Sequence, residues 1–268
     1  MALEIDLSDR VVLVTGGVRG VGAGISRVLL AAGATVVACA RRPAETPVEV
    51  GGRAIDFLPC DVRDAEAVRA MVAEVVRRYG RLDAAVNNAG GAPYALAADA
   101  SPKFHTKIIE LNLLAALHVA QAAHAVMSER ETGGSIINIS SLSGHRPSPG
   151  TAAYGAAKAG VDALTVSLAA EWAPRVRVNS LVVGAVETEL AELHYGDADG
   201  VAAVGQTIPM GRMARPDDVG NGVAFLLSPL AGYISGATLQ IHGGGEPPAF
   251  LAAANAAHST DAAKTAQP

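Results

Sequence analysis

The chain has 268 residues, of which 50% are hydrophobic, 18% charged and 4% aromatic. That length suits one large domain, and so high an apolar content excludes a wholly disordered chain. With 21 lysines and arginines against 26 aspartates and glutamates, the net charge is −5, which disfavours nucleic acid as a partner. The two cysteines, Cys39 and Cys60, are too few for a disulfide framework, and we expect both to be buried and reduced.

No uninterrupted apolar run reaches the roughly 18 residues that a membrane helix needs. The first ten residues include Glu4, Asp6 and Asp9 and no basic run, so a secretory signal is not expected. These features predict a cytoplasmic protein without a membrane partner.

Short runs rich in branched residues alternate with longer helical patterns from residue 11 to about 242. The short runs lack polar alternation, as expected of parallel strands covered on both faces. Strands are expected at Val11–Thr15, Thr35–Ala40, 82–87, 135–140, Val176–Val183 and 237–241. Helices are expected at 22–32, Ala65–Tyr79, 103–127, 151–173 and Pro216–Leu227. In the second of these helices, Asp64 is the expected cap and Gly80 the expected stop. The alternation predicts a single α/β domain over residues 1–245, with a doubly wound parallel sheet and helices on both faces.

Two segments depart from the alternation. Residues 185–215 mix four glycines and a proline with short apolar pieces, and they follow an expected strand. Because ligands bind beyond the carboxyl ends of strands in open α/β sheets, this segment is a candidate substrate loop, with an ordinary surface insertion as the alternative. The Ala-rich tail, 246–268, is expected to be partly disordered or to form a helix that packs only in an oligomer.

The first expected strand runs directly into a turn with four glycines in seven residues, among them Gly16, Gly20 and Gly22. Glycines allow a tight turn and a close approach to a pyrophosphate, which then meets the amides at the start of the next helix. We therefore expect Gly16, Arg19, Gly20 and Val21 to bind a dinucleotide.

Two arginines, Arg41 and Arg42, follow the second strand. A site for NAD usually has an acidic residue there to accept hydrogen bonds from the ribose hydroxyl. Arginines suit a 2′-phosphate instead, and Arg19 can reach the same group. This favours NADP(H), with NAD(H) still possible and solvated surface charges as the alternative for both arginines.

The third expected strand ends in Asn87, followed by Asn88, Ala89 and Gly90. Small residues there let the chain pass close to a flat ligand, although a simple strand-ending turn accounts for the same residues. Asn112 is a carboxamide in an otherwise apolar helix, and it needs hydrogen-bond partners that are either structural or part of a proton relay. The seven histidines are scattered, so no metal site is expected.

The sharpest local signal is the pair Tyr154 and Lys158. Residues four apart share a helix face, so the phenol and the ammonium can point into one pocket. Lowering a tyrosine pKa from about 10 to 7 requires about 4 kcal/mol, and an adjacent ammonium acts in that direction. Ser141, thirteen residues upstream at the end of a strand, can hold a substrate oxygen while Tyr154 exchanges the proton.

Together these residues resemble the short-chain dehydrogenase/reductase family from about residue 8 to 245. Residues 15–22 match its glycine turn, residues 87–90 its Asn-Asn-Ala-Gly motif, and Asp61 and Val62 its adenine-contacting pair. The family's catalytic tetrad falls on Asn112, Ser141, Tyr154 and Lys158.

The resemblance implies a Rossmann-type fold, a nicotinamide cofactor and a homotetramer or homodimer. It also implies that Tyr154 is the acid/base, that Ser141 positions the substrate oxygen, and that Lys158 binds ribose and lowers the tyrosine pKa. Asn112 would hold a water in a proton relay. Gly184, Val186 and Thr188 fall in the segment that contacts the nicotinamide, and Asn88, Ala89 and Gly90 line the cofactor.

The chain departs from the family at two places. Val183-Gly184 replaces a common Pro-Gly, and His242 replaces a common aspartate. The resulting prediction is an NADP(H)-dependent oxidoreductase that interconverts a secondary alcohol and a ketone. An NAD-dependent alcohol dehydrogenase and a non-catalytic nucleotide-binding regulator are the alternatives. Residues proposed for a partly apolar substrate pocket are Ser143, His145, Val183, Val186, Leu190, Leu193 and Tyr195.

Overall fold

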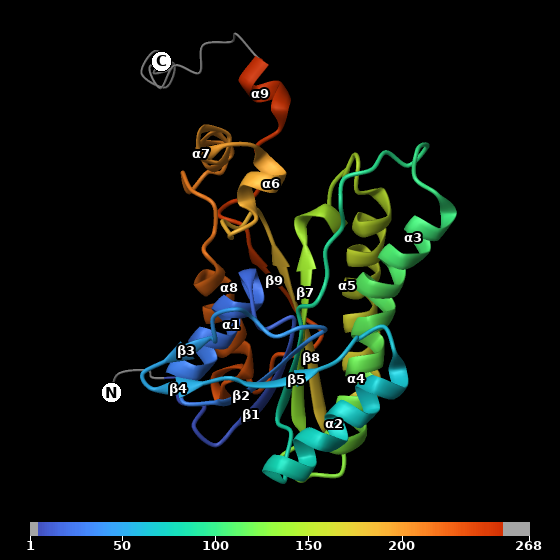
Figure 1. The fold of residues 1–268 in the computed structure, drawn as a ribbon, viewed down its shortest axis with the longest axis vertical. Helices are drawn as coiled ribbons and strands as arrows, with labels where there is room; N and C mark the ends of the chain where they lie inside the picture. Colours follow the sequence, from blue (N-terminus) through green and yellow to red (C-terminus); the bar gives the residue numbers. More distant parts are fainter. Residues whose placement is uncertain (1–4, 254–268) are drawn as a thin grey trace, which may run out of the picture.

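The computed structural model describes residues 5–253 and consists of a seven-stranded parallel sheet with helices on both faces (Figure 1). The expected α/β fold is therefore confirmed. The sheet strands are β1 (Val11–Thr15), β2 (Thr35–Ala40), β5 (Asp56–Pro59), β6 (Ala84–Asn87), β7 (Gly134–Ser141), β8 (Val176–Val183) and β9 (Thr238–Ile241). A separate short hairpin joins β3 (Glu49–Val50) to β4 (Arg53–Ala54).

The order of the sheet is β5-β2-β1-β6-β7-β8-β9. After β1 the chain builds outward through β2 and β5, and then returns to place β6 on the other side of β1. At such a reversal the loops after two neighbouring strands lead away from each other, which opens a crevice at their carboxyl ends. The glycine turn after β1 and residues 88–90 after β6 both lie at this crevice.

The two faces of the sheet have separate apolar cores. On one face α1 (Gly20–Ala31) and α8 (Pro216–Leu227) pack side chains such as Ile25 and Val223 against the strands. On the other face lie α2 (Ala65–Tyr79), α4 (Ala115–Met127) and α5 (Ala152–Trp172). All five residues of β1 are buried, because both faces are covered.

The ends of α2 are set by the two residues that the sequence indicates. The Asp64 side chain accepts hydrogen bonds from the backbone N–H groups of Glu66 and Ala67, and Gly80 ends the helix with a left-handed φ of 70°. A cap of this kind contributes about 1 kcal/mol to stability.

The expected helix over 103–127 is interrupted, and in this respect the prediction was wrong. It consists of α3 (Pro102–Ile109), a π-helical turn (Glu110–Leu114) and α4. Asn112 lies in the π turn, and its side chain donates to the carbonyl of Ile108 one turn earlier. That bond uses a carbonyl that would otherwise serve the helix, so the helix widens there.

By length and composition, Pro102–Met127 resembles a membrane helix, with a mean hydropathy of 1.2. In the fold it packs as part of the protein interior: Val119, Ala120 and Ala123 are buried against the sheet.

The sequence also missed β5, a short strand at the edge of the sheet that ends in Pro59 and has one fully buried residue, Leu58. Within residues 185–215 lie α6 (Ala191–Tyr195) and α7 (Ala198–Gln206), and a bridge between Val186 and Ala214 joins the two ends of the segment. Of the tail, α9 (Ala249–Ala253) is described, whereas 254–268 lie outside the described residues. The domain limits of 1–245 and the character of the tail stay predictions.

Candidate active site

The glycine turn after β1 is closed by contacts that leave no room for side chains. Gly16 and Gly20 have left-handed φ values of 65° and 51°. A Cβ on Gly22 would lie 2.1 Å from the carbonyl oxygen of Gly16, and one on Gly17 would lie 2.9 Å from the Ala38 side chain. Real side chains do not tolerate such distances, so the turn depends on glycine at these positions.

The amino end of α1 has no cap from its own N-cap residue. Its N-cap, Arg19, makes no side-chain capping bond, unlike Asp64 in α2 and Ser101 in α3. Free N–H groups at a helix start form a binding site for phosphate. The turn and the helix start therefore fit the diphosphate of a dinucleotide.

A carboxylate already contacts this helix start. The Glu189 side chain, from the segment after β8, accepts a hydrogen bond from the Gly20 N–H at 3.0 Å. The sequence gives no indication of this contact, because 169 residues separate the two partners. The carboxylate thus lies on one of the donors that a diphosphate would use.

The turn is tied to the chain after β6 through Thr15 and Asn88. The Thr15 hydroxyl accepts from the N–H groups of Asn88 and Ala89 at 3.0 and 2.9 Å, and the Asn88 amide donates to the Thr15 carbonyl at 2.9 Å. These bonds give Asn88 a positioning role at the crevice and bring Ala89 next to Gly16. Cofactor binding by Asn88, Ala89 and Gly90 stays a prediction.

The residues expected to bind adenosine gather at the ends of β2 and β5. Arg41 and Arg42 are exposed, and the positive charge of Arg41 contributes to lowering the pKa of Asp61. The main cause of that lowered pKa is the Arg63 side chain, which binds both oxygens of Asp61. Val62 is buried at 6% exposure.

Three members of the expected tetrad meet where α5 passes the end of β7. The Lys158 Nζ lies 5.6 Å from the centre of the Tyr154 ring and donates to the Ile139 carbonyl at 2.7 Å. Ser141 is the last residue of β7, and its side chain acts to lower the pKa of Tyr154. The Ser141 hydroxyl also accepts from the Ser143 N–H at 3.2 Å.

Burial is the main cause of the pKa shifts of Tyr154 and Lys158 on α5. It raises the pKa of Tyr154, and the Ser141 hydroxyl acts in the opposite direction. Burial also lowers the pKa of Lys158 to about 8, with Asp162 opposing that change. Without a bound cofactor, Tyr154 is therefore a neutral phenol at pH 7, a state suited to giving a proton.

Asn112, the fourth member, uses its side chain to hold the backbone after β6. Its oxygen accepts from the Gly91 N–H at 2.8 Å, and its nitrogen donates to the carbonyls of Gly91 and Ile108 at 3.0 and 2.9 Å. A Cβ on Gly90 would lie 2.6 Å from that oxygen and 3.5 Å from the Lys158 Nζ. Asn112 is thus near Lys158, and its side chain has a structural role; a water-holding role stays a prediction.

The sequence did not single out Asp162, one turn beyond Lys158 on α5. Its carboxylate accepts from Ser140 at 2.7 Å and Ser180 at 2.5 Å, and contacts the His145 ring at 2.9 Å. It thereby links α5 to the ends of β7 and β8. An acidic residue within an otherwise apolar stretch of α5 was a usable signal for this role.

Comparison with known proteins places this chain in a large family. The family model described as enoyl-(acyl carrier protein) reductase matches residues 16–246. L-fucose dehydrogenase of Bos taurus is 37% identical over 92% of this chain and 93% of its own. The chain belongs to the short-chain dehydrogenase/reductase family. It is therefore an oxidoreductase that acts on alcohol or carbonyl groups, in a family that uses NAD or NADP.

Two further relatives agree with this assignment. The 3-oxoacyl-acyl-carrier-protein reductase of Vibrio cholerae is 35% identical over 90% of this chain and 98% of its own. A crystal structure of a putative short-chain alcohol dehydrogenase from Sinorhizobium meliloti superimposes with a TM-score of 0.84, at 36% identity over 90% of this chain and 98% of the other. The match covers both the cofactor end and the chemical end of the fold.

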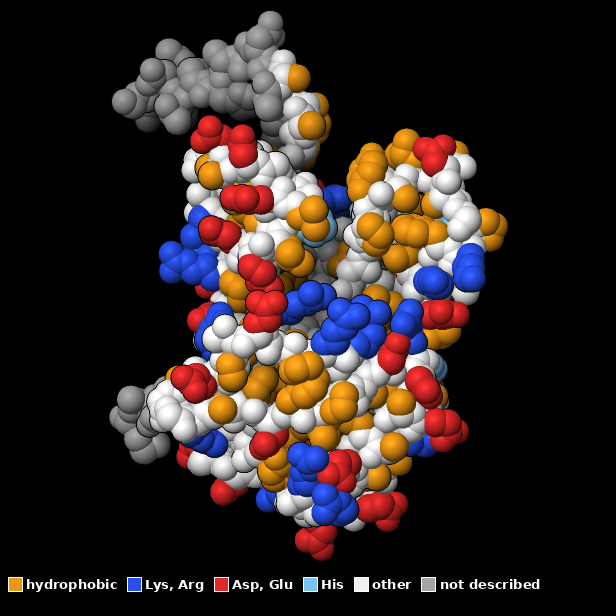
Figure 2. Space-filling model, viewed as in Figure 1, with side chains coloured by type: hydrophobic (Ala, Val, Ile, Leu, Met, Phe, Trp, Pro, Cys, Tyr) orange, Lys and Arg blue, Asp and Glu red, His pale blue; other side chains and the backbone are white. Residues whose placement is uncertain are grey.

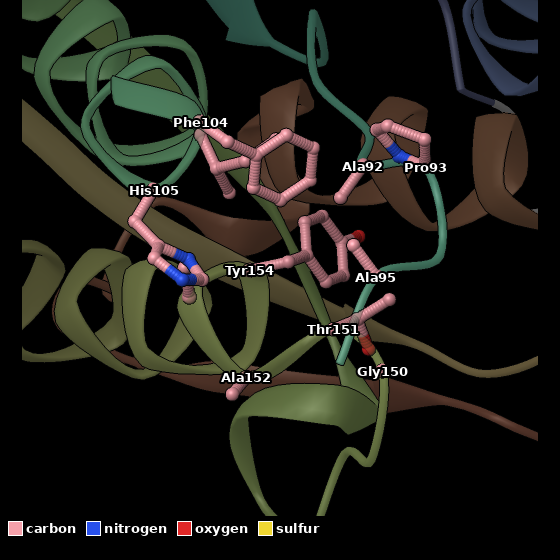
Figure 3. A pocket seen from close by; sticks show the side chains of 11 residues that line it. Ala92, Pro93, Ala95, Phe104, His105, Gly150, Thr151, Ala152 and Tyr154 are labelled. Atoms are coloured by element: carbon pink, nitrogen blue, oxygen red, sulfur yellow. The ribbon is translucent and has the colours of Figure 1, made fainter. Parts of the chain in front are cut away.

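The surface of the protein is hollowed at the carboxyl edge of the sheet, between a lobe with α6 and α7 and a lobe with α3 (Figure 2). The cavity beside Tyr154 is only about 10 Å³ and holds no more than a water molecule. Figure 3 shows the Tyr154 ring there, between Phe104 of α3 and Ala95. Substrate therefore has to reach Tyr154 from the open hollow.

The residues expected to line the substrate pocket differ in their environment. Leu190 and Leu193 are exposed, at 42% and 77%, and are available for an apolar ligand, whereas Val183 is buried in the core. His145 is held by Asp162. Burial raises the pKa of Tyr195, and the Arg146 guanidinium acts to lower it.

The two departures from the family pattern are neighbours in space. The Gly184 N–H donates to the Ile241 carbonyl, and a Cβ on Gly184 would lie 2.8 Å from that of His242. Val186 forms a bridge to Ala214, and Thr188 accepts from the Leu190 N–H. The turn after β8 is thus held by β9 and by residue 214, even though proline is absent.

Proposed function

We propose that this protein is an NADP(H)-dependent oxidoreductase that interconverts a secondary alcohol and a ketone, with Tyr154 as the acid/base. The observation that carries the proposal is the position of Tyr154 and Lys158. They lie on one face of α5, against Ser141 and beside Gly90. The phenol is thereby held next to the crevice that a nicotinamide ring would enter.

Each side chain has a separate task in this mechanism. A bound nicotinamide supplies the hydride in reduction and accepts it in oxidation. The Ser141 hydroxyl holds the substrate oxygen, and Tyr154 gives that oxygen a proton in reduction or removes one in oxidation. Lys158, fixed through the Ile139 carbonyl, binds ribose and favours the phenolate form when it is protonated.

The preference for NADP(H) is supported by the end of β2. Arg41 and Arg42 stand there where an acidic residue would accept from a 2′-hydroxyl, and Arg19 begins α1 nearby. Guanidinium groups bind phosphate through paired hydrogen bonds, and they cannot accept a hydrogen bond from a 2′-hydroxyl.

Replacing the phenol tests the chemical step. Tyr154→Phe is expected to lower kcat by at least about a hundredfold, the usual minimum contribution of a general acid, and to leave the Kd for NADPH within about twofold. Tyr79→Phe is the matched control, because Tyr79 ends α2 far from the crevice, and it is expected to retain full activity. Turnover retained by Tyr154→Phe would remove the proposed mechanism.

Parallel titrations with NADPH and NADH test the cofactor. We expect tighter binding of NADPH and a loss of that preference in Arg41→Ala. Cofactor fluorescence is the better signal, because Trp172, the single tryptophan, stacks on His124 and lies fourteen residues beyond Lys158 on α5, about 20 Å away. A preference for NADH would instead identify an NAD-dependent dehydrogenase.

The named relatives suggest where a substrate search should begin. One is named as a dehydrogenase of L-fucose and another as a reductase of 3-oxoacyl groups on acyl carrier protein, so L-fucose and a 3-oxoacyl thioester are the first compounds to assay. The exposed Leu190 and Leu193 favour a substrate with an apolar part.

A further inference from the structure

The amino edge of the sheet carries an open cavity of about 270 Å³. Its wall is formed at the starts of β1, β6, β7 and β8, together with the turn Pro229–Ala231. Strand β7 shows how far it lies from the active site: Ser135 lines this cavity, and Ser141, six residues on, ends the strand at the active site. Six residues of strand span about 20 Å, so the cavity is separate from the crevice.

The cavity has an excess of positive charge although the protein is acidic. Three arginines and one carboxylate line it, namely Arg10, Arg175, Arg177 and Asp83. Arg81, outside the lining, binds both oxygens of Asp83 at 2.6 and 2.7 Å, and the same carboxylate accepts from a backbone N–H. Arg10 also forms an ion pair with Asp83, at 3.7 Å, so among the described residues the lining arginines without an acidic partner are Arg175 and Arg177.

Arg175 and Arg177 are held in place by backbone carbonyls rather than by acidic side chains. Arg177 donates to the carbonyls of Leu226 and Ile234 at 2.8 and 3.0 Å, and Arg175 makes two longer contacts, of 3.3 and 3.4 Å, with carbonyls 130 and 131. Within residues 5–253 neither forms an ion pair. Burial, and then the charge of Arg10, lower the pKa of Arg177. The fold thus holds like charges together with N–H donors to spare.

A buried hydroxyl in the same wall lacks a partner. Ser135 is 5% exposed, and among the described residues its hydroxyl has no hydrogen-bond partner. Buried polar groups are nearly always hydrogen-bonded, and this hydroxyl is an exception. Its oxygen is covered by neighbouring atoms, so Ser135 adds a polar residue to the wall of the cavity but does not itself reach a ligand.

We propose that this cavity is a second binding site, specific for a phosphate-type oxyanion such as a diphosphate or a phosphate ester. Tetrahedral oxyanions accept hydrogen bonds from several directions at once, which suits guanidinium groups that come from two separate segments, one before β1 and one at the start of β8, and the fork of each matches two oxygens. The cavity is several times the roughly 30 Å³ share of one water, so a diphosphate fits.

Isothermal titration with inorganic pyrophosphate tests the proposal, on protein saturated with NADPH so that the phosphate positions of the crevice are filled. We expect one equivalent to bind. Arg175→Gln removes a donor that has only weak backbone contacts. Loss of one hydrogen bond to a charged group is expected to weaken binding about tenfold in this variant. Ser135→Ala, at a hydroxyl that is covered by neighbouring atoms, is expected to bind like the wild type. Arg69→Gln, an exposed arginine on α2, is the charge-matched control and is expected to bind like the wild type.

Several results would overturn the proposal. These are the absence of heat in the wild type, displacement of pyrophosphate by NADPH, and equal weakening in Arg69→Gln and Arg175→Gln. Displacement of bound pyrophosphate by chloride at matched ionic strength would also overturn the proposal, because the binding would then be nonspecific attraction between charges. Circular dichroism of each variant confirms that it is folded. Binding that survives NADPH and is weakened in Arg175→Gln but not in Arg69→Gln supports the site.

Discussion

Burial of Lys158 has opposite consequences for stability and for chemistry. The side chain is 5% exposed, and its pKa falls from 10.5 to about 8. A shift of two and a half units at 1.36 kcal/mol each means that the charged lysine costs the folded state about 3 kcal/mol below pH 8. The same burial puts the ammonium beside Tyr154, where it favours the phenolate.

The pH dependence of stability follows from that shift. Between pH 8 and 10.5 the folded lysine has lost its proton while the unfolded lysine keeps it, so stability rises with pH in this range. Relative to Lys158→Met, the wild type is expected to gain about 2 to 3 kcal/mol in the free energy of unfolding from pH 7 to 10. Urea unfolding at a series of pH values measures it. Lys103→Met, at an exposed lysine, controls for general charge effects. Parallel curves for the wild type and Lys158→Met would show that Lys158 is not buried as a cation.

At the scale of elements, the segment after β8 competes with the cofactor for the start of α1. The Glu189 carboxylate accepts from the Gly20 N–H, at the place where a diphosphate would bind. Charges at a helix start are worth about 0.3 to 1 kcal/mol. Glu189→Gln is therefore expected to tighten NADPH binding about two- to fivefold, measured by cofactor fluorescence. Glu187→Gln, two residues away, is the control and is expected to change nothing. Weaker binding in Glu189→Gln would mean that the carboxylate helps to hold the cofactor.

The close packing of α1 on α8 leads to a prediction about stability. An alanine inside a helix is usually about 1 kcal/mol more stable than a glycine. At Gly24, however, a Cβ would lie 2.3 Å from the Pro216 side chain and 2.4 Å from its backbone. Gly24→Ala is expected to lower the free energy of unfolding by about 1 to 3 kcal/mol through overpacking. Gly205→Ala in α7 meets nothing closer than 3.6 Å and is expected to be neutral or stabilising. Urea unfolding of both variants separates propensity from packing, and a stabilised Gly24→Ala would contradict the close contact.

The elements that the sequence predicted are those whose pattern reflects burial. The strands β1, β2 and β8 are continuous apolar runs, because both faces of the sheet are covered, and their bounds match. Strand β5 has only four residues, of which the first and last, Asp56 and Pro59, are exposed because the strand lies at the edge of the sheet. The π turn at Asn112 leaves the apolar pattern of its helix almost unchanged, so periodicity cannot reveal it.

The functional residues also divide into those that local sequence spacing predicts and those that only the folded chain brings together. Tyr154, Lys158 and Ser141 were predictable because local spacing on one helix and one strand end places them. Glu189 was not, because only the folding of the whole chain brings it to Gly20. The arginines around Asp83 likewise come from distant segments and have no common motif.

At the scale of the whole molecule, two separate surfaces expose large apolar side chains. On the face with α4 and α5, Leu114 and Val166 are 39% and 56% exposed. At the edge of the sheet, Leu239 on β9 is 37% exposed, and Leu230 and Tyr233, in the segment that precedes β9, are exposed as well. Single exposed apolar residues are ordinary, but groups of them mark association surfaces. A symmetric contact through one surface gives a dimer, and contacts through both give a tetramer.

We therefore expect the protein to be a homodimer or homotetramer in solution, measured by size-exclusion chromatography with light scattering. Val166→Glu places a charge in the middle of the α4–α5 surface, and burying that unpaired charge costs several kcal/mol in each contact. The substitution is expected to halve the particle mass while the subunits stay folded. Met210→Glu, at a residue 68% exposed in the segment after α7, is the matched control and is expected to keep the wild-type mass. A monomeric wild type would contradict association, and an unchanged mass in Val166→Glu would assign it to the β9 surface alone.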